Sequence, residues 1–454
     1  MLSTDRIQSA LINRPLFLNI RAVTAAFGTY FCMYMFRKPF TAASYEAAVL
    51  SDWDQKTILV SAQVIGYLIS KLAGVRVVSE VSRSTRGVLL IGLILASHAA
   101  LLLFAVVPAP FHILAIFLNG LPLGMVFGLV LGFLEGRRMT EALTAGLCAS
   151  FILAGGFSKT IGQWVLSYLT QSLGFSMIGA ERWMPFIAGM LFVIPLLFSV
   201  WMLVQIPSPS QRDISERSER NPMTRADRLG LLRTYGIGMF SVSVLYFLTT
   251  ILRSIRDDFA PEILLGMGAT VKPSAYATID LCVATIVLVV NGLSVLVRDN
   301  RRALMLAFGI SFIGFLMIAG SMVLRDMSSI SPLGFMVVVG AGLYLPYVAI
   351  HTTVFERMIA LTRDRGNIGF LMYVVDSLGY FGYVAIMIFR NFMPKSDGSS
   401  ANQILSGFRW ACWISVVISL VFTVIAAVYF SRIKTIQSQS REWLGVEQPE
   451  SIPA

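Results

Sequence analysis

Long apolar runs recur along the chain, separated by short stretches that contain charged residues, glycine, proline or serine. A bilayer core about 30 Å thick requires roughly 20 apolar residues for one helical crossing. The runs are continuous and lack an alternation with a period of two, which favours helices over the strands of a membrane barrel. We predict twelve helices, near residues 16–40, 57–79, 87–107, 110–134, 142–170, 184–206, 231–256, 273–297, 302–323, 332–355, 367–390 and 406–431.

The composition agrees with a lipid environment. Of the 454 residues, 56% are hydrophobic and 13% are charged, and the mean hydropathy is +0.74, which is too apolar for a soluble protein of this size. The net charge of +11 could suggest a nucleic-acid partner, but the basic residues lie in short loops between apolar runs. We predict an all-α polytopic membrane protein that binds no nucleic acid.

The helices divide into six and six. We predict an N-terminal half over residues 1–206, a cytoplasmic linker over 207–230, a C-terminal half over 231–431 and a cytoplasmic tail over 432–454. The linker holds five arginines and four acidic residues and is too short for a third domain.

The arginines between the helices predict the orientation. Cytoplasmic loops of membrane proteins are enriched in Lys and Arg, and one set of loops is the richer one here, with Arg76, Arg83, Arg86, Arg137, Arg138, Arg298, Arg301, Arg302, Arg357, Arg363 and Arg365. The first run has no small-residue cleavage site behind it, so we expect it to be retained. We predict a multi-pass protein of the cell (inner) membrane with both termini in the cytoplasm.

The two halves resemble each other. Tyr30 and Phe31 precede Arg37, and Tyr246 and Phe247 precede Arg253 with the same spacing. A parallel repeat of two six-helix halves is the signature of the major facilitator architecture, in which the substrate site lies between the repeats near the middle of the membrane. We therefore predict that fold, and we expect a monomer.

Several polar side chains lie inside apolar runs, where a charge costs about 2.5–3.5 kcal/mol at the bilayer centre. Helical spacing places Tyr30, Tyr34 and Arg37 on one face of the first helix, and Tyr246 and Arg253 repeat this arrangement on the seventh. Further candidates for a central cavity are Tyr67 and Lys71, Lys159, Asp280, and the stripe Tyr373, Asp376, Tyr380 and Tyr383.

Structural roles are the alternative for these residues. Arg37, Lys38 and Arg253 lie late in their predicted helices and could extend to the outer membrane interface. Asp376 could pair with a nearby arginine instead of contacting a substrate. Four glycines spaced by four residues, Gly120, Gly124, Gly128 and Gly132, predict close helix contact.

No catalytic or metal site is predicted. The histidines His98, His112 and His351 are scattered, and the four cysteines occur singly in apolar runs. We find no nucleophile with a His and acid set, so we expect neither an enzyme, nor a cofactor, nor a metal.

Four segments resemble the organophosphate:phosphate antiporters, the glycerol-3-phosphate transporter family. They are the stretch from Tyr34 to Phe40 with Arg37-Lys38, the stretch Leu252-Arg253 followed by Asp258, Phe259 and Pro261, the Ser70-Lys71 pair after Tyr67, and the acid Asp280. The resemblance implies that Arg37 and Arg253 bind a phosphate. It also implies gating ion pairs between the halves, Lys38 with Asp258 and Lys71 with Asp280.

The chain departs from that family at other positions. Ile152 stands where the family has a histidine, and Asp376 is an additional acid, so the substrate need not be glycerol phosphate. We predict a secondary active transporter of a small anionic metabolite, with a coupling proton as a further expected partner. The alternatives are a transporter-like membrane sensor and a lipid flippase on the same fold.

Overall fold

The computed structural model describes residues 15–45, 54–134, 137, 140–208, 225–294, 296–297, 299–355, 357–358, 368–391 and 400–432. The elements in this part of the chain are helical. The long ones are α2 (Pro15–Met35), α3 (Gln55–Glu80), α4 (Arg83–Val106), α7 (Thr140–Gln171), α11 (Arg225–Asp258), α13 (Ser274–Ser294), α14 (Asn300–Asp326), α15 (Pro332–Ala349), α17 (Ile368–Asn391) and α18 (Ser400–Arg432).

Two further crossings are made of shorter pieces. One consists of α5 (His112–Gly120), the 3-10 turn η2 (Leu123–Met125) and α6 (Val126–Leu134), and the other of α8 (Met177–Met190) and α9 (Val193–Val204). Within the described residues, eleven helical spans are long and apolar enough to cross a membrane, and α17, with the apolar stretch Val375–Phe389, takes the place of the predicted eleventh helix. The predicted all-α polytopic fold is confirmed.

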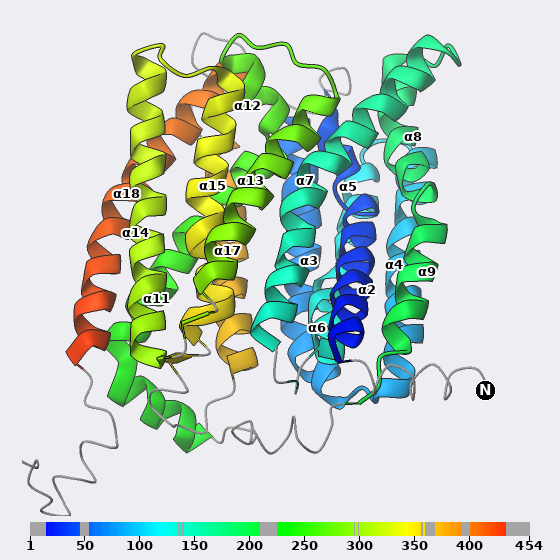
Figure 1. Ribbon diagram of the computed structural model, residues 1–454. Helices are drawn as coiled ribbons and strands as arrows, with labels where there is room; N and C mark the ends of the chain where they lie inside the picture. The colour runs from blue at the N-terminus through cyan, green and yellow to red at the C-terminus, as the bar shows by residue number, and fades with distance from the viewer. Residues whose placement is uncertain are drawn as a thin grey trace, which may run out of the picture.

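The helices form two groups. Figure 1 shows α2 to α9 side by side in one group and α11 to α18 in the other, with the start of α2 and the end of α18 on the same face of the bundle. The predicted domain boundaries at 206 and 231 stay predictions, and residues 209 to 224 of the predicted linker lie outside the described residues.

Among the helices whose bounds differ from the prediction, three have an identifiable local cause. The first ends at Met35 and not near residue 40, because a turn and the 3-10 helix η1 (Pro39–Ala42) follow it. The fourth is interrupted at Pro122, whose ring nitrogen cannot donate a helical hydrogen bond. The sixth begins at Met177, before the predicted residue 184, because the Ser176 side chain caps it by accepting from the Gly179 amide at 3.2 Å.

Glycines allow α5 and α3 to pack backbone against backbone. A Cβ atom on Gly120 would lie 2.1 Å from the carbonyl oxygen of Gln63, and one on Gly124 would lie 2.3 Å from that of Tyr67. Small residues at such contacts let membrane helices approach closely. The packing fixes the position of α3, which carries Tyr67 and Lys71 toward the centre of the molecule.

The distribution of polar and apolar side chains is inverted relative to a soluble protein. Large apolar residues lie on the outside, and Ile194 and Val88 expose 80% and 75% of their surface. Charged residues lie inside, where Arg37 and Asp258 expose only 2% and 1%. Lipid is the solvent that suits such an exterior, and the polar interior is where the candidate site lies.

Candidate functional site

Two small adjoining cavities lie between the two groups of helices. Tyr34, Arg253 and Tyr380 line both of them. Arg37, Lys38 and Asp258 line the first, whereas Tyr30, Tyr67, Lys71 and Asp376 line the second. The structure thus brings most of the predicted substrate residues together at one place between the halves.

Arg37 lies in the turn that follows α2. Its guanidinium carbon is 3.9 Å from the centre of the Tyr67 ring and 5.9 Å from that of Tyr34. These are cation–π distances. The side chain is buried, and it lines the first cavity, so Arg37 does not extend to the membrane interface.

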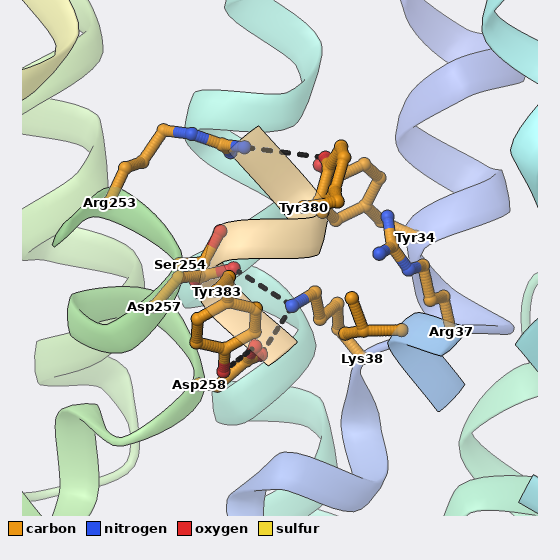
Figure 2. Close-up of a pocket in the computed structure, with 10 residues that line it drawn as sticks. Tyr34, Arg37, Lys38, Arg253, Ser254, Asp257, Asp258, Tyr380 and Tyr383 are labelled. Carbon is orange, nitrogen blue, oxygen red and sulfur yellow. Dashed lines mark hydrogen bonds and ion pairs between the residues drawn. The ribbon is translucent and has the colours of Figure 1, made fainter. Parts of the chain in front are cut away.

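Arg253 is the counterpart on α11. Its guanidinium carbon lies 4.6 Å from the centre of the Tyr347 ring, and one of its N–H groups donates to the Tyr380 hydroxyl over 3.4 Å. Figure 2 shows Arg37 and Arg253 on opposite sides of Tyr380. Among the described residues, no carboxylate lies within 4.0 Å of either guanidinium, and the Nε atoms of both have no hydrogen-bond partner.

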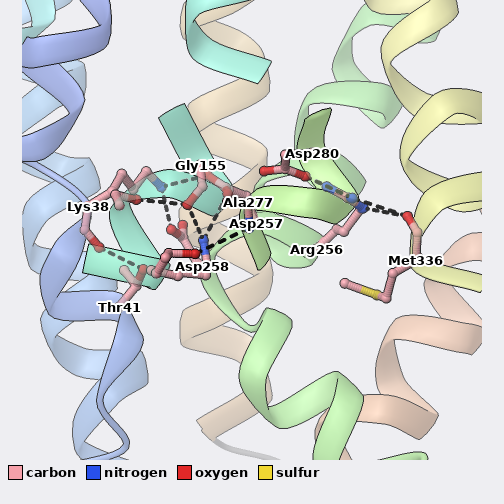
Figure 3. A network of polar contacts seen from close by, with 12 residues as sticks. Lys38, Thr41, Gly155, Arg256, Asp257, Asp258, Ala277, Asp280 and Met336 are labelled. Carbon is pink, nitrogen blue, oxygen red and sulfur yellow. Dashed lines mark hydrogen bonds and ion pairs between the residues drawn. The ribbon is translucent and has the colours of Figure 1, made fainter. Parts of the chain in front are cut away.

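The remaining charges of the region are paired. Lys38 bonds to Asp258 and lies 3.5 Å from Asp257, which in turn lies 3.0 Å from Lys159. The Tyr383 hydroxyl donates to Asp258 over 2.8 Å. We call Lys38, Lys159, Asp257 and Asp258 the gate cluster, and Figure 3 shows Lys38, Asp257 and Asp258 of it. Lys38 and Lys159 come from the first half of the chain and the two aspartates from the second, so the cluster joins the halves.

The implied pair of Lys71 with Asp280 is wrong in this structure. Lys71 on α3 pairs with Asp376 on α17. Asp280 on α13 pairs with Arg256 at 3.1 Å, and Arg256 also donates to the Met336 carbonyl. Asp280 therefore has a cation on a neighbouring helix of its own half, whereas Lys71 faces a different acid across the second cavity.

The charges of this region do not balance. If all are ionised, the six cations Arg37, Lys38, Lys71, Lys159, Arg253 and Arg256 stand against the four carboxylates Asp257, Asp258, Asp280 and Asp376. Two positive charges remain, and by the pairing above they belong to Arg37 and Arg253. A buried charge without a counter-ion is costly in an apolar medium, so this excess suits a ligand of opposite sign.

The predicted tyrosines have different positions. Tyr30 and Tyr34 line the cavities beside Arg37, with their ring centres 5.6 Å apart. Tyr246 is buried behind the second cavity and bonds to other polar groups instead of lining it. Tyr373 lies in α17, but its side chain is outside the described part of the chain.

Sequence reasoning missed Asp257, Arg256, Tyr347 and His351. The run Arg256-Asp257-Asp258 was available as a signal, since three consecutive charges end an apolar helix. His351 gave none, because it lies in the π-helical turn η3 (Ile350–Val354), which changes the helical phase after α15. The residues described hold no group of three or more His, Cys, Asp or Glu side chains suited to a metal ion.

The sequence matches a protein-family model over residues 39–433, described as "Family of unknown function (DUF5690)". The chain belongs to this family. No curated protein gives a significant match.

Three solved structures of similar fold are transporters. A bacterial homologue of the human drug peptide transporters PepT1 and PepT2 aligns with a TM-score of 0.59 at 11% identity, over 91% of this chain and 98% of that one. An autoinhibited POT family peptide transporter gives 0.53 at 14% identity, over 93% and 98%. The human organic anion transporter MFSD10 (TETRAN) gives 0.53 at 13%, over 90% and 99%. At these identities the likeness concerns the fold, which is of the major facilitator type.

Proposed function

We propose that this DUF5690 protein is a secondary active transporter of a small organic anion, and that Arg37 and Arg253 bind the anion together. The observation that carries the proposal is the pair of buried guanidiniums without a carboxylate partner among the described residues. The site's other cations have carboxylate partners, so these two arginines are free for a ligand.

The hydrogen-bonding geometry of the guanidinium group limits the chemical class of the ligand. The group's planar set of N–H donors matches the oxygens of a phosphate or carboxylate and forms paired, charge-assisted hydrogen bonds. One arginine from each half and two excess positive charges favour a dianion, such as a phosphate monoester or a dicarboxylate. The motif resemblance to the organophosphate:phosphate antiporters supports the phosphate ester, and that finer assignment rests on the motifs alone.

The gate cluster gives a basis for alternating access. A bound anion draws the two arginines, and hence the two halves, toward each other. Breaking the bonds from Lys38 to Asp258 and from Lys159 to Asp257 would let the halves separate on the side of that cluster. Rocking of two halves about a central site is how transporters with such repeats change the exposed side. The three solved structures of similar fold named above are transporters, one of them of organic anions.

The test is a thermal-shift panel on purified protein in detergent. A ligand that binds the native state raises its stability by mass action. The probes are glycerol 3-phosphate, inorganic phosphate, succinate, glucose and a phospholipid. The variants are Arg37→Gln and Arg253→Gln, and the control is Arg409→Gln, which removes an arginine that pairs with Asp326 on the exposed surface.

We expect an anionic probe to raise the melting temperature of the wild type and of Arg409→Gln, and we expect both cavity variants to lose that response. If glucose or the phospholipid stabilises the protein and the cavity variants retain the effect, the anion site is refuted. A retained phospholipid response would favour the flippase alternative.

A further inference from the structure

A chain of polar groups in the second half of the protein runs behind the wall of the second cavity and joins two residues that line it, His351 and Asp376. The Tyr246 hydroxyl oxygen lies 2.6 Å from Asp376 Oδ1, 2.6 Å from His351 Nε2 and 2.9 Å from the Tyr347 hydroxyl. The other carboxylate oxygen of Asp376 bonds to Lys71. All five side chains are buried.

The hydrogen bonds define where protons can reside. The Tyr246 hydroxyl has a single proton, and an ionised Asp376 can only accept, so Tyr246 donates to Asp376. Its oxygen can then accept a bond from His351 Nε2–H. The Nδ1 atom of His351 is buried and has no hydrogen-bond partner, which leaves its lone pair available to a proton. The chain is therefore oriented to carry a proton from His351 to Asp376.

The elements place this chain at a contact between the halves. Lys71 belongs to α3 of the first half, and Asp376 belongs to α17 of the second. His351 reaches the cavity from the π-helical turn η3, a distortion that is frequent at functional sites. The bond between Lys71 and Asp376 thus links the two halves within the cavity that Arg253 also lines.

The ion pair of Lys71 with Asp376 interacts electrostatically with an anion bound in the cavity. A substrate anion beside Arg253 is attracted to Lys71 and repelled by the Asp376 carboxylate. A proton on Asp376 removes the repulsion and frees the Lys71 ammonium for the substrate, so proton binding and anion binding favour each other.

The other titratable or charged groups around Asp376 come from five elements: Tyr67 on α3, Arg253 on α11, Tyr347 on α15, Tyr380 on α17, and Tyr30 and Tyr34 on α2. None of them is a second carboxylate. Asp376 is therefore the acid of this cavity that can take up the proton.

We infer that Asp376 is the proton-binding site of a proton–anion symport, and that Tyr246 and His351 relay the proton to it. This inference rests on the proposed function. In the relay step a proton from water binds His351 Nδ1, the Nε2 proton passes to the Tyr246 oxygen, and the Tyr246 proton passes to Asp376 Oδ1. His351 and Tyr246 end neutral, and one proton has moved onto the carboxylate.

The experiment uses proteoliposomes that enclose a pH-sensitive dye, with labelled glycerol 3-phosphate, inorganic phosphate or succinate as probes. Two modes are compared: exchange of labelled for unlabelled probe at equal pH, and uptake driven by an acidic exterior. For the wild type we expect both, with acidification of the interior and about tenfold accumulation per unit of pH difference if one proton accompanies each anion.

The variants separate the proton site from the relay. Asp376→Asn resembles the protonated acid, so we expect exchange to continue and to lose its pH dependence, while driven uptake disappears. Tyr246→Phe should slow driven uptake several-fold and slow exchange less than it slows driven uptake. Asp326→Asn, at an exposed carboxylate, and Tyr168→Phe, at an exposed tyrosine, are the matched controls and should behave like the wild type.

The wild type alone can overturn the inference. If a probe exchanges at equal pH, but an acidic exterior drives neither its accumulation nor a probe-dependent acidification of the interior, proton symport is refuted while the anion transporter stands. Proton-driven uptake that survives in Asp376→Asn would place the proton site elsewhere. Failure of every probe to bind or exchange would instead refute the proposed function, and the inference with it. If Asp376→Asn does not fold, the wild-type acidification measurement still decides.

Discussion

Three residues of the gate cluster, Lys38, Asp257 and Asp258, line the first cavity together with Arg37 and Arg253, but the charges of the cluster and of the arginine pair have different neighbours. In the gate cluster each lysine has a carboxylate within 3.5 Å, and the paired groups come from opposite halves. Arg37 and Arg253 have aromatic rings and a hydroxyl as neighbours, and no carboxylate among the described residues. Charges that are neutralised within the protein can hold the halves together, whereas charges without a partner are suited to hold something that arrives from outside.

The largest effect on stability is expected from Asp258→Asn, which tests whether the gate cluster holds the halves together. This substitution leaves Lys38 buried with only the more distant Asp257, which Lys159 also uses. Removing one partner of a buried ion pair costs about 3–5 kcal/mol, and we expect a loss of unfolding free energy near the lower figure. Denaturant unfolding in detergent measures it. A double variant, Lys38→Met with Asp258→Leu, should recover most of the loss, and failure to recover would show that the pair is not the cause.

A smaller effect is expected from Arg253→Lys. Lysine keeps the positive charge but loses the planar set of donors that can bind two oxygens at once. Losing one hydrogen bond to a charged group costs about 1.5 kcal/mol, or roughly a tenfold weaker affinity. Titration calorimetry with the anion found in the thermal-shift panel measures it. An unchanged affinity would mean that Arg253 acts only through its charge.

The arginine pair should respond to neutralisation in the opposite direction from the gate cluster. Without ligand, Arg37→Met removes a buried cation that lacks a carboxylate partner. The lost contact with Tyr67 is worth up to about 2 kcal/mol, but the relieved desolvation cost of a buried charge is several kcal/mol. We expect the ligand-free variant to be about 1 kcal/mol more stable than the wild type. A destabilised variant would contradict the view that these arginines are retained for binding.

The smallest effect is expected at the surface. The pair of Arg409 with Asp326 is exposed, with 35% and 51% of the side chains accessible. Exposed pairs contribute about 0–1 kcal/mol, so Asp326→Asn should leave the melting temperature almost unchanged. A large loss would mean that charge pairing stabilises this protein irrespective of burial, and the contrast between the two buried regions would lose its meaning.

Hydropathy was sufficient to predict the all-helical membrane fold, because the length of an apolar run is a direct requirement of the bilayer. The spacing that relates Arg37 to Arg253 made both arginines candidates for a central cavity, with the outer membrane interface as the alternative, and both side chains line the first cavity. The prediction that Arg37 shares one face of the first helix with Tyr30 and Tyr34 was only partly correct. Arg37 lies in a turn before Pro39 and not on the helix face with Tyr30 and Tyr34.

The pairing of buried charges was harder to predict. Asp280 could have faced Lys71 or a cation of its own half, and only the 3.1 Å distance from Arg256 on α11 shows which cation is its partner. Helical periodicity could not predict the direction of the His351 side chain, because the π-helical turn rotates it relative to the residues of α15. Sequence patterns identify which groups are buried, but the choice among several oppositely charged neighbours depends on distances of a few ångströms.

The glycines of α7 have a consequence for how the halves can move. A Cβ atom on Gly156 would lie 2.1 Å from the carbonyl oxygen of Tyr276 on α13, so the two halves meet there through their main chains. A contact between main chains can shift without any side chain changing its rotamer and without interdigitated side chains having to separate. It can serve as a fulcrum, about which a small rotation at the centre becomes a wide displacement at the ends of helices some 30 Å long.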